Sequence, residues 1–263
     1  MPHRQNWESQ KFLAREEALL ACILDLGEML LTSGAEIKRV EDMVYRLCKV
    51  YSFVRVDVFT ITSSIVLTVR TPGGRILSQT RRILTRDTDL GRVEKVNALS
   101  RKLCAAPASL RDFQREIARL RRDGTYPTWV QRCMYIVISA AFCLFFGGTT
   151  ADGVAAAISG LVLFQTLRMS KPLRLNGTLQ CMMASFITGL AVVGLYWLGL
   201  GEHPDMISMG NIMLLIPGIA FTAALRDIIN GDTLAGIISL CEAILRALAV
   251  AIGFAAMLTM TGG

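Results

Sequence analysis

Six residues that could handle a polar substrate or an ion lie close together in an otherwise apolar stretch near the C-terminal end of the sequence. They are Pro217, Gly218, Arg226, Asp227, Asp232 and Glu242. A proline–glycine pair inside a membrane helix frees backbone carbonyls, which a membrane protein tolerates where protein or water satisfies them. Interrupted helices of this kind mark the substrate and ion sites of transporters. The stretch therefore predicts part of a transport pathway.

The charged residues of this stretch suggest two roles. Arg226 is suited to bind a substrate carboxylate. Glu242 lies about 15 Å along the last predicted helix from Asp232, close to the middle of a bilayer, where it could carry a proton. An alternative is that Glu242 forms a structural ion pair with Arg246, which is four residues further along the same helix.

Four of the polar residues also have structural explanations. Asp232 is a good N-cap residue for the last helix, and Arg226 with Asp227 could be an ion pair at a helix end. Asn211 lies earlier on the interrupted helix and could hydrogen-bond either a substrate or a neighbouring helix. We keep all of these residues as candidates for the substrate or ion pathway.

Charge divides the sequence into two regions. Residues 1–128 hold 22 Lys or Arg and 15 Asp or Glu, a net charge of +7, whereas residues 129–263 hold 6 of each. Soluble domains have about 25% charged residues, and this whole chain has 19%. We therefore expect a polar domain at residues 1–125 and a transmembrane domain at residues 126–263.

Five apolar runs in the second region are candidates for transmembrane helices. A helix needs about 20 apolar residues to cross ~30 Å of hydrocarbon, and the third and fifth runs clearly exceed that length. The five runs are 133–146, 153–167, 178–200, 206–225 and 234–258. Because the first two runs are short, a re-entrant hairpin is an alternative to two crossings.

The basic residues favour one orientation for these runs. If residues 1–128 are cytoplasmic and every run crosses, the turns at 147–152 and 201–205 lie outside, and neither contains Lys or Arg. The basic residues that then lie inside are Arg168, Lys171, Arg174 and Arg226. This distribution follows the positive-inside rule, although a re-entrant first pair would leave the same charges inside. Five crossings place the two chain ends on opposite faces.

The polar region has the pattern of a small α+β domain with the order ααβββαα. Its predicted helices and strands lie at 10–33, 35–51, 53–60, 64–70, 75–82, 90–104 and 110–122. Gly34 is expected to end the first helix. The fold class is therefore an α-helical polytopic membrane protein with about five transmembrane helices and an N-terminal α+β cytoplasmic domain.

No catalytic, cofactor or metal site is predicted. The sequence has no Cys-x-x-Cys pair and two histidines, His3 and His203, and it has neither a nucleophile–base set nor a glycine-rich nucleotide motif. The basic helix at 110–122 precedes the first membrane run, so anionic lipid is a more plausible partner than nucleic acid. A solvated helix face explains that helix more simply.

Two stretches are similar to the signatures of the threonine/serine exporter family (ThrE-like). IMLLIPGIAFTAALRDIINGD at 212–232, followed by Gly236 and Cys241-Glu242-Ala243, is similar to its membrane signature. GEMLLTSGAEIKRVEDMVYRLCKVY at 27–51 resembles its N-terminal signature. The residues that carry this second likeness are Gly34, Ala35, Glu36, Arg39, Val40 and Glu41, together with Asn97, Ser100 and Arg101. The resemblance covers most of residues 18–258.

The resemblance implies a multi-pass exporter of the inner (plasma) membrane that moves small hydrophilic metabolites out of the cytoplasm, driven by an ion gradient and most simply by protons. Threonine and serine are the family's named substrates, and some two-component members are linked to dicarboxylates such as succinate. Full-length members continue into a second, smaller membrane half, whereas this sequence stops at Gly263. It therefore resembles the larger subunit of the two-component form, with a smaller membrane subunit as partner.

Two other functions fit parts of the sequence. The polar domain could be the working part of a membrane-anchored enzyme or sensor, with the helices as its anchor. The chain could also be a structural scaffold whose partner holds the substrate site. Separately, the chain could form a homo-oligomer. An anchor does not require charged residues at membrane depth or an interrupted helix, so the exporter subunit is the preferred interpretation.

Overall fold

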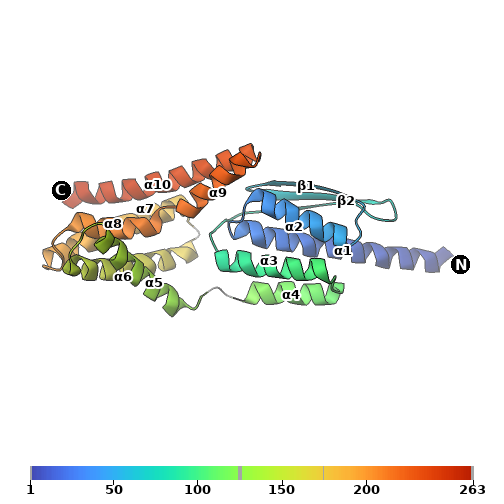
Figure 1. Cartoon of the computed structure of the whole chain (residues 1–263), viewed down its shortest axis with the longest axis horizontal. Coiled ribbons are helices and arrows are strands. Elements are labelled where there is room, and N and C mark those ends of the chain that lie inside the picture. Colours follow the sequence, from blue (N-terminus) through green and yellow to red (C-terminus); the bar gives the residue numbers. More distant parts are fainter. Residues whose placement is uncertain (1, 124–125, 174, 262–263) are drawn as a thin grey trace. The chain divides into compact units, whose positions relative to one another are not determined.

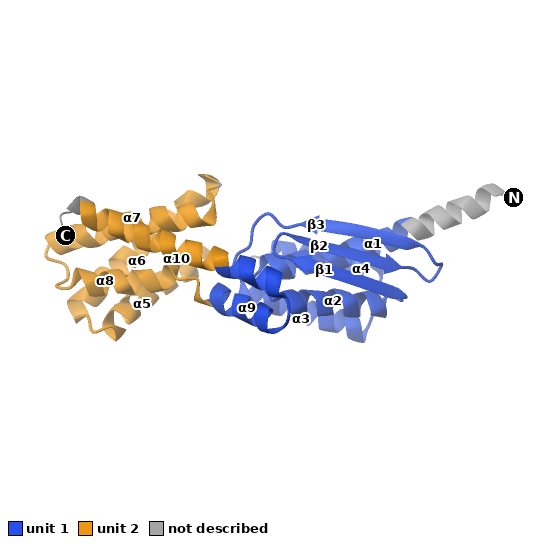
Figure 2. Ribbon diagram, turned by 90° about the horizontal axis from the view of Figure 1, so that it is seen from above, with its two compact units in different colours: residues 1–125, 219–240 blue, residues 126–218, 241–263 orange. Residues whose placement is uncertain are grey.

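The computed structural model describes residues 2–123, 126–173 and 175–261, which form two compact units (Figure 2). Unit 1 consists of Met1–Thr125 and Ile219–Leu240, and unit 2 consists of Tyr126–Gly218 and Cys241–Gly263. One junction between the units lies between residues 125 and 126. The segment Ile219–Leu240, which we expected in the transmembrane domain, instead groups with the N-terminal unit.

Unit 1 has three layers, each made from amphipathic elements. In Figure 1 the three-stranded sheet, the pair α1 and α2, and the pair α3 and α4 follow one another. The bounds are α1 (Pro2–Thr32), α2 (Ile37–Val50), β1 (Arg55–Ile61), β2 (Ser64–Arg70), β3 (Ile76–Arg82), α3 (Leu90–Ala105) and α4 (Leu110–Arg122). This is the predicted order, and β2 and α4 have the predicted bounds.

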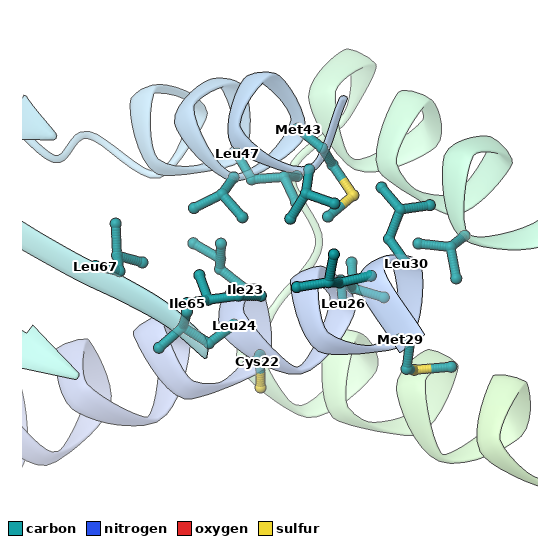
Figure 3. Packing of buried hydrophobic residues seen from close by; sticks show 14 of the residues in the cluster. Cys22, Ile23, Leu24, Leu26, Met29, Leu30, Met43, Leu47, Ile65 and Leu67 are labelled. Carbon is teal, nitrogen blue, oxygen red and sulfur yellow. The ribbon is translucent and has the colours of Figure 1, made fainter. Parts of the chain in front are cut away.

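The middle layer explains why the first helix is apolar on several faces. α1 contacts α2, the sheet, α3 and α4, so its side chains are enclosed from several directions. Figure 3 shows Ile23, Leu24 and Leu26 of α1 packed with Leu47 of α2 and Ile65 of β2, all fully buried. Each such side chain contributes roughly 1.5–3 kcal/mol by leaving water. This core holds α2 in a fixed position.

The sheet is antiparallel with the order β1-β2-β3. Ser64 pairs with Ile61 of β1 and with Arg82 of β3, which sets the register of both ladders. In β2 the buried side chains alternate with partly exposed ones, because successive residues of a strand point to opposite faces. Ile65, Leu67 and Val69 therefore face the helices.

Unit 2 is a bundle of apolar helices. Its members are α5 (Thr128–Phe145), α6 (Thr150–Ser170), α7 (Gly177–Trp197), α8 (Pro204–Leu215) and the later part of α10 (Thr233–Thr261). Small residues allow close packing, as is usual between membrane helices. A Cβ built on Gly210 of α8 would lie 2.5 Å from the carbonyl oxygen of Ser139 and 3.0 Å from the amide nitrogen of Cys143, both on α5.

Among the described residues, four helices are long and apolar enough to cross a membrane: α5, α6, α7 and α10. A fifth crossing results if α8 and α9 (Gly218–Ile229) are taken together as one bent span. The predicted single run at 206–225 is thus two helices bent by 46° at Ile216 and Pro217. Both predicted short runs are longer in the structure, since α5 begins at Thr128 and α6 begins at Thr150.

Candidate functional site

The polar end of α9 lies against the start of α2 in unit 1. The backbone amide of Ile37 donates a hydrogen bond to Oδ1 of Asp227, at 3.1 Å, and both residues are buried. The first amides of a helix have no partner within the helix, and a side-chain carboxylate at the N-cap normally accepts one of them. The N-cap residue Glu36 makes no such bond, so Asp227 supplies the cap from α9.

The side chain of Glu36 instead pairs with arginines. Its Oε1 lies 2.5 Å from Nη1 of Arg226 and 3.8 Å from Nη2 of Arg39. The Glu36 side chain is mostly buried, with 17% exposed, whereas that of Arg226 is 61% exposed. The structure therefore brings Glu36 and Arg39 of the N-terminal motif together with Arg226 and Asp227 of the membrane motif.

Gly34 and Arg86 hold the segment between α1 and α2 in place. Gly34 has φ +86°, and its amide donates to Leu31 while the next amide donates to Leu30, a common way for a helix to end. Arg86 donates to the carbonyl oxygen of Ala35 at 3.5 Å and to Oγ of Ser239 in α10 at 3.2 Å. Both helices of the α9–α10 hairpin thus contact this segment.

Glu41, one turn after Glu36, anchors α2 to the sheet. Its Oε1 accepts a hydrogen bond from the backbone amide of Thr60 in β1 at 2.8 Å. Burial raises the pKa of the Glu41 carboxyl above its ordinary value, although the bond from Thr60 opposes this shift. The charge of Asp232, at the turn between α9 and α10, raises this pKa further. Asp232 is therefore electrostatically close to the N-terminal motif.

Asn211 has hydrogen bonds to its neighbouring helices. It is fully buried on α8, and Oγ of Ser139 on α5 donates to its Oδ1 at 3.1 Å. Its Nδ2 donates to Oγ of Ser159 on α6 at 2.8 Å and to the carbonyl of Ile207 at 2.9 Å. Two roles were considered for Asn211, and the structure shows the hydrogen bonds to neighbouring helices.

The break between α8 and α9 is a short turn around Pro217. The amide of Gly218 donates to the carbonyl of Ile216 at 2.9 Å, and a Cβ built on Gly218 would meet nothing within 4 Å. Proline has no amide hydrogen, so one backbone bond that a continuous helix would make is missing here. The glycine leaves open space beside the chain at this point.

Glu242 does not form the ion pair with Arg246 that was the structural alternative to a proton-carrying role. No carboxylate lies within 4.0 Å of Arg246 in the part of the chain that the structure describes, and Glu242 is exposed on α10. The guanidinium of Arg246 instead lies beside Gly177 at the start of α7. An (i, i+4) spacing permits contact, but Arg246 is turned towards the neighbouring helix.

One buried acid was missed by the sequence analysis. Asp152, fully buried at the start of α6, accepts bonds from the amides of Thr149, Glu202 and His203 and lies 2.9 Å from Nδ1 of His203. The hydrogen bond to Asp152 raises the pKa of His203 above its ordinary value. The pattern Thr149-x-x-Asp152, a capping box, was the available signal.

The arrangement suits binding and movement of charge better than covalent chemistry. In the described residues, no group of three or more His, Cys, Asp or Glu side chains could hold a metal ion. The residues that converge are cations and carboxylates on two helix ends, which can bind, orient or release charged groups.

Comparison with known proteins gives three relatives and one family. The model of the family described as "Putative threonine/serine exporter" matches residues 21–261. A "Probable threonine/serine exporter" of Mycobacterium tuberculosis is 22% identical over 89% of this chain and 45% of its own length. Proteins named "Probable succinate transporter subunit YjjP" are 26% identical in Escherichia coli and 24% in Klebsiella aerogenes.

The coverage differs between these relatives. The chain spans less than half of the mycobacterial protein but 96% of each of the two succinate transporter subunits, over 94% and 95% of its own length. No solved structure matches the chain.

Proposed function

The chain belongs to the threonine/serine exporter family, and from this premise we propose that it is the larger subunit of a secondary exporter. Its cargo is a small hydrophilic metabolite, either threonine and serine or a dicarboxylate such as succinate, which leaves the cytoplasm with a proton gradient as the driving force. The chain covers 96% of each of the two relatives named as succinate transporter subunits, and this likeness favours a dicarboxylate as the cargo.

One observation carries the proposal. α9 begins at the break in the bent span and carries Arg226 and Asp227 near its end, where both contact the start of α2. In secondary transporters, half-helices of this kind present backbone groups and charges to the cargo. A movement of α2 would therefore be passed directly to α9, which is what a gated pathway needs.

We propose that the N-terminal unit is cytoplasmic and that the chain lies in the inner membrane. The positive-inside rule supports this, because the turns at 147–152 and 201–205 lack Lys and Arg. With α8 and α9 counted as one span, the C-terminus lies on the opposite face.

Glu242 supports a second chain in the working protein. It lies about 3 Å along α10 beyond Leu240, the last residue of the cytoplasmic unit, and therefore at the cytoplasmic end of the membrane segment. A charged side chain that faces lipid within a membrane segment is unfavourable, so such residues normally face protein or a water-filled cavity. We propose that the smaller membrane subunit covers this part of α10 and that Glu242 carries the coupled proton.

Cys241 provides a native probe for this partner, because it is exposed and adjacent to Glu242. A membrane-permeant maleimide should label it in the chain alone and label it several times more slowly when the smaller subunit is co-expressed. Cys133, exposed on α5, serves as the internal reference. Equal labelling of Cys241 with and without the smaller subunit would argue against a partner at this position.

Transport itself is tested in proteoliposomes that contain this chain with the smaller subunit. Vesicles loaded with labelled succinate, threonine or serine should release one of them when a pH gradient is imposed, and release should stop when the gradient is collapsed. A Glu242→Gln variant should retain binding and lose the dependence on pH. Absence of flux for all three compounds would refute the exporter function.

The alternative of a membrane-anchored enzyme or sensor makes a different prediction. An anchor would leave the activity of the N-terminal unit unaffected by Glu242→Gln, whereas a coupled exporter would be slowed. The contact between α2 and α9 argues for the exporter, since an anchor does not need it.

A further inference from the structure

A polar pocket of about 370 Å³ lies in unit 1, between α2 and α3. Arg39 and Arg46 line it from one face of α2, since residues seven apart share a helix face. Asn97 and Arg101 line it from one face of α3, four residues apart. The pocket has the size of common small-molecule sites, which are roughly 300–1,000 Å³.

The lining of this pocket has an excess of positive charge. Lys38, Arg39, Arg46 and Arg101 contribute four positive charges, against negative charges from Glu36 and Asp42, a net of +2. Glu36 is already paired with Arg226. Within the described ranges, no carboxylate lies within 4.0 Å of Lys38, Arg46 or Arg101. Positive charge in the pocket is therefore only partly compensated by the protein.

The remaining lining groups are neutral hydrogen-bonding residues and one apolar residue. Asn97 and Asn230 provide side-chain amides, and Ser100, which is 7% exposed, provides a hydroxyl. Met43, 5% exposed, contributes an apolar surface beside them. This combination suits a short carbon chain that carries charged ends.

We propose that this pocket binds a small organic dianion of the dicarboxylate class from the cytoplasmic side. Guanidinium groups match carboxylates in geometry and can bind them through two parallel hydrogen bonds. The net charge of +2 matches a dicarboxylate. An amino-acid zwitterion fits less well, because its ammonium group would face the arginines. The inference rests on the proposed function for the origin of the ligand, since it gives this class of cargo a site on the N-terminal unit.

The position of the pocket connects it to α9. Arg39 lines the pocket and also lies 3.8 Å from the carboxylate of Glu36, which Arg226 shares. A ligand carboxylate bound by Arg39 would replace the Glu36 carboxylate at that guanidinium. Glu36 would then pair with Arg226 alone. Binding in the pocket would thereby strengthen the contact between α2 and α9.

Calorimetric titration of the full chain in lipid nanodiscs tests the site with three probes. Succinate should bind, butyrate should bind at least tenfold more weakly because it lacks the second carboxylate, and inorganic phosphate should not bind more tightly than succinate. Arg101→Gln should weaken succinate binding about tenfold or more. Arg119→Gln changes an exposed residue on α4 outside the pocket. The affinity of this variant for succinate should stay within about twofold of that of the unchanged chain, as expected for a surface position.

Three results would overturn the proposal: no succinate binding, equal effects of Arg101→Gln and Arg119→Gln, or tighter binding of phosphate. The proposed function fails separately. Succinate binding without flux in proteoliposomes would remove the exporter function and keep the pocket. Flux that is unaffected by Arg101→Gln, together with no calorimetric binding, would remove the pocket and keep the exporter.

Discussion

Asp227 caps a helix that begins 190 residues before it, because its carboxylate accepts the hydrogen bond of the backbone amide of Ile37 at 3.1 Å. The contact joins the stretch at residues 27–51 to the stretch at residues 212–232 through one hydrogen bond. It also explains why Glu36 at the N-cap is free to pair with Arg226.

Removing the cap should destabilise unit 1. Asp227→Ala would leave the buried amide of Ile37 without a partner, which costs about 1–3 kcal/mol. Asp227→Asn keeps an acceptor oxygen and should cost less. Thermal unfolding in detergent, followed by tryptophan fluorescence, measures both. Equal loss of stability for the two variants would show that the hydrogen bond is not the important feature.

The pair between Glu36 and Arg226 should matter more for transport than for stability. Because the Arg226 side chain is 61% exposed, we expect a stability change of about 0–1 kcal/mol for Arg226→Gln. We expect the flux to fall about tenfold, equivalent to roughly 1.4 kcal/mol of coupling. If the two residues act as a unit, Glu36→Gln combined with Arg226→Gln should be no slower than either variant alone. Additive losses would mean that the residues act independently.

Glu41 should behave as a hydrogen-bond acceptor whose charge is unfavourable. Its folded pKa is raised, mainly by burial, so its contribution to stability is present below the ordinary pKa and is lost as pH rises through the raised value. At pH 7, Glu41→Gln keeps the acceptor for the amide of Thr60 and removes the charge, so it should be neutral or stabilising. Glu41→Ala should lose about 1 kcal/mol. Unfolding curves at pH 4 and pH 7 compare the variants, and a clear loss with Gln at pH 7 would contradict the prediction.

His203 should make the stability of unit 2 depend on pH. The bond to Asp152 favours the protonated imidazole, so the pKa of His203 rises on folding and the pair stabilises the folded state. This stabilisation is complete below the ordinary pKa of 6.5 and is lost as pH rises through the higher folded pKa. The unfolding temperature should therefore fall as pH rises from about 6.5 through the raised pKa of His203. In His203→Gln the fall should be smaller. An identical pH profile in the two proteins would exclude this pair as the cause.

Gly210 should not tolerate a side chain. Its Cβ would lie 2.5 Å from the carbonyl oxygen of Ser139, so Gly210→Ala must push α8 away from α5, at a cost of about 1–3 kcal/mol. Gly194→Ala on α7 is the matched control, because a Cβ there meets nothing within 4 Å. Alanine has the better helix propensity by about 1 kcal/mol. In thermal unfolding we therefore expect Gly210→Ala to lower the unfolding temperature and Gly194→Ala to raise it.

Local patterns in the sequence were enough to predict most of the elements. The strand Ser64–Arg70 could be placed because a β-branched run is followed by the turn at Thr71–Gly74, and both signals are local. The helix Leu110–Arg122 follows Ser109, whose side chain accepts the amide hydrogen bond of Asp112. Periodicity and capping act over a few residues, so a single sequence contains them.

The candidate site was predictable in its residues but not in its contacts. Arg226 and Asp227 could be selected as charged residues beside an interrupted helix, whereas Glu36 and Arg39 were selected through the family resemblance. Their meeting depends on the packing of α9 against α2, which no periodicity encodes. The pair of Glu242 with Arg246 shows the converse case, because helical spacing allowed a contact that the packing of Arg246 against α7 replaced.

The discontinuity of unit 1 also has a consequence for biosynthesis. The ribosome completes residues 1–125 long before it makes Ile219–Leu240, so the amide of Ile37 has no cap until the fourth membrane segment has been translated. α5 to α8 must therefore be threaded into the bilayer while the N-terminal unit is still unfinished.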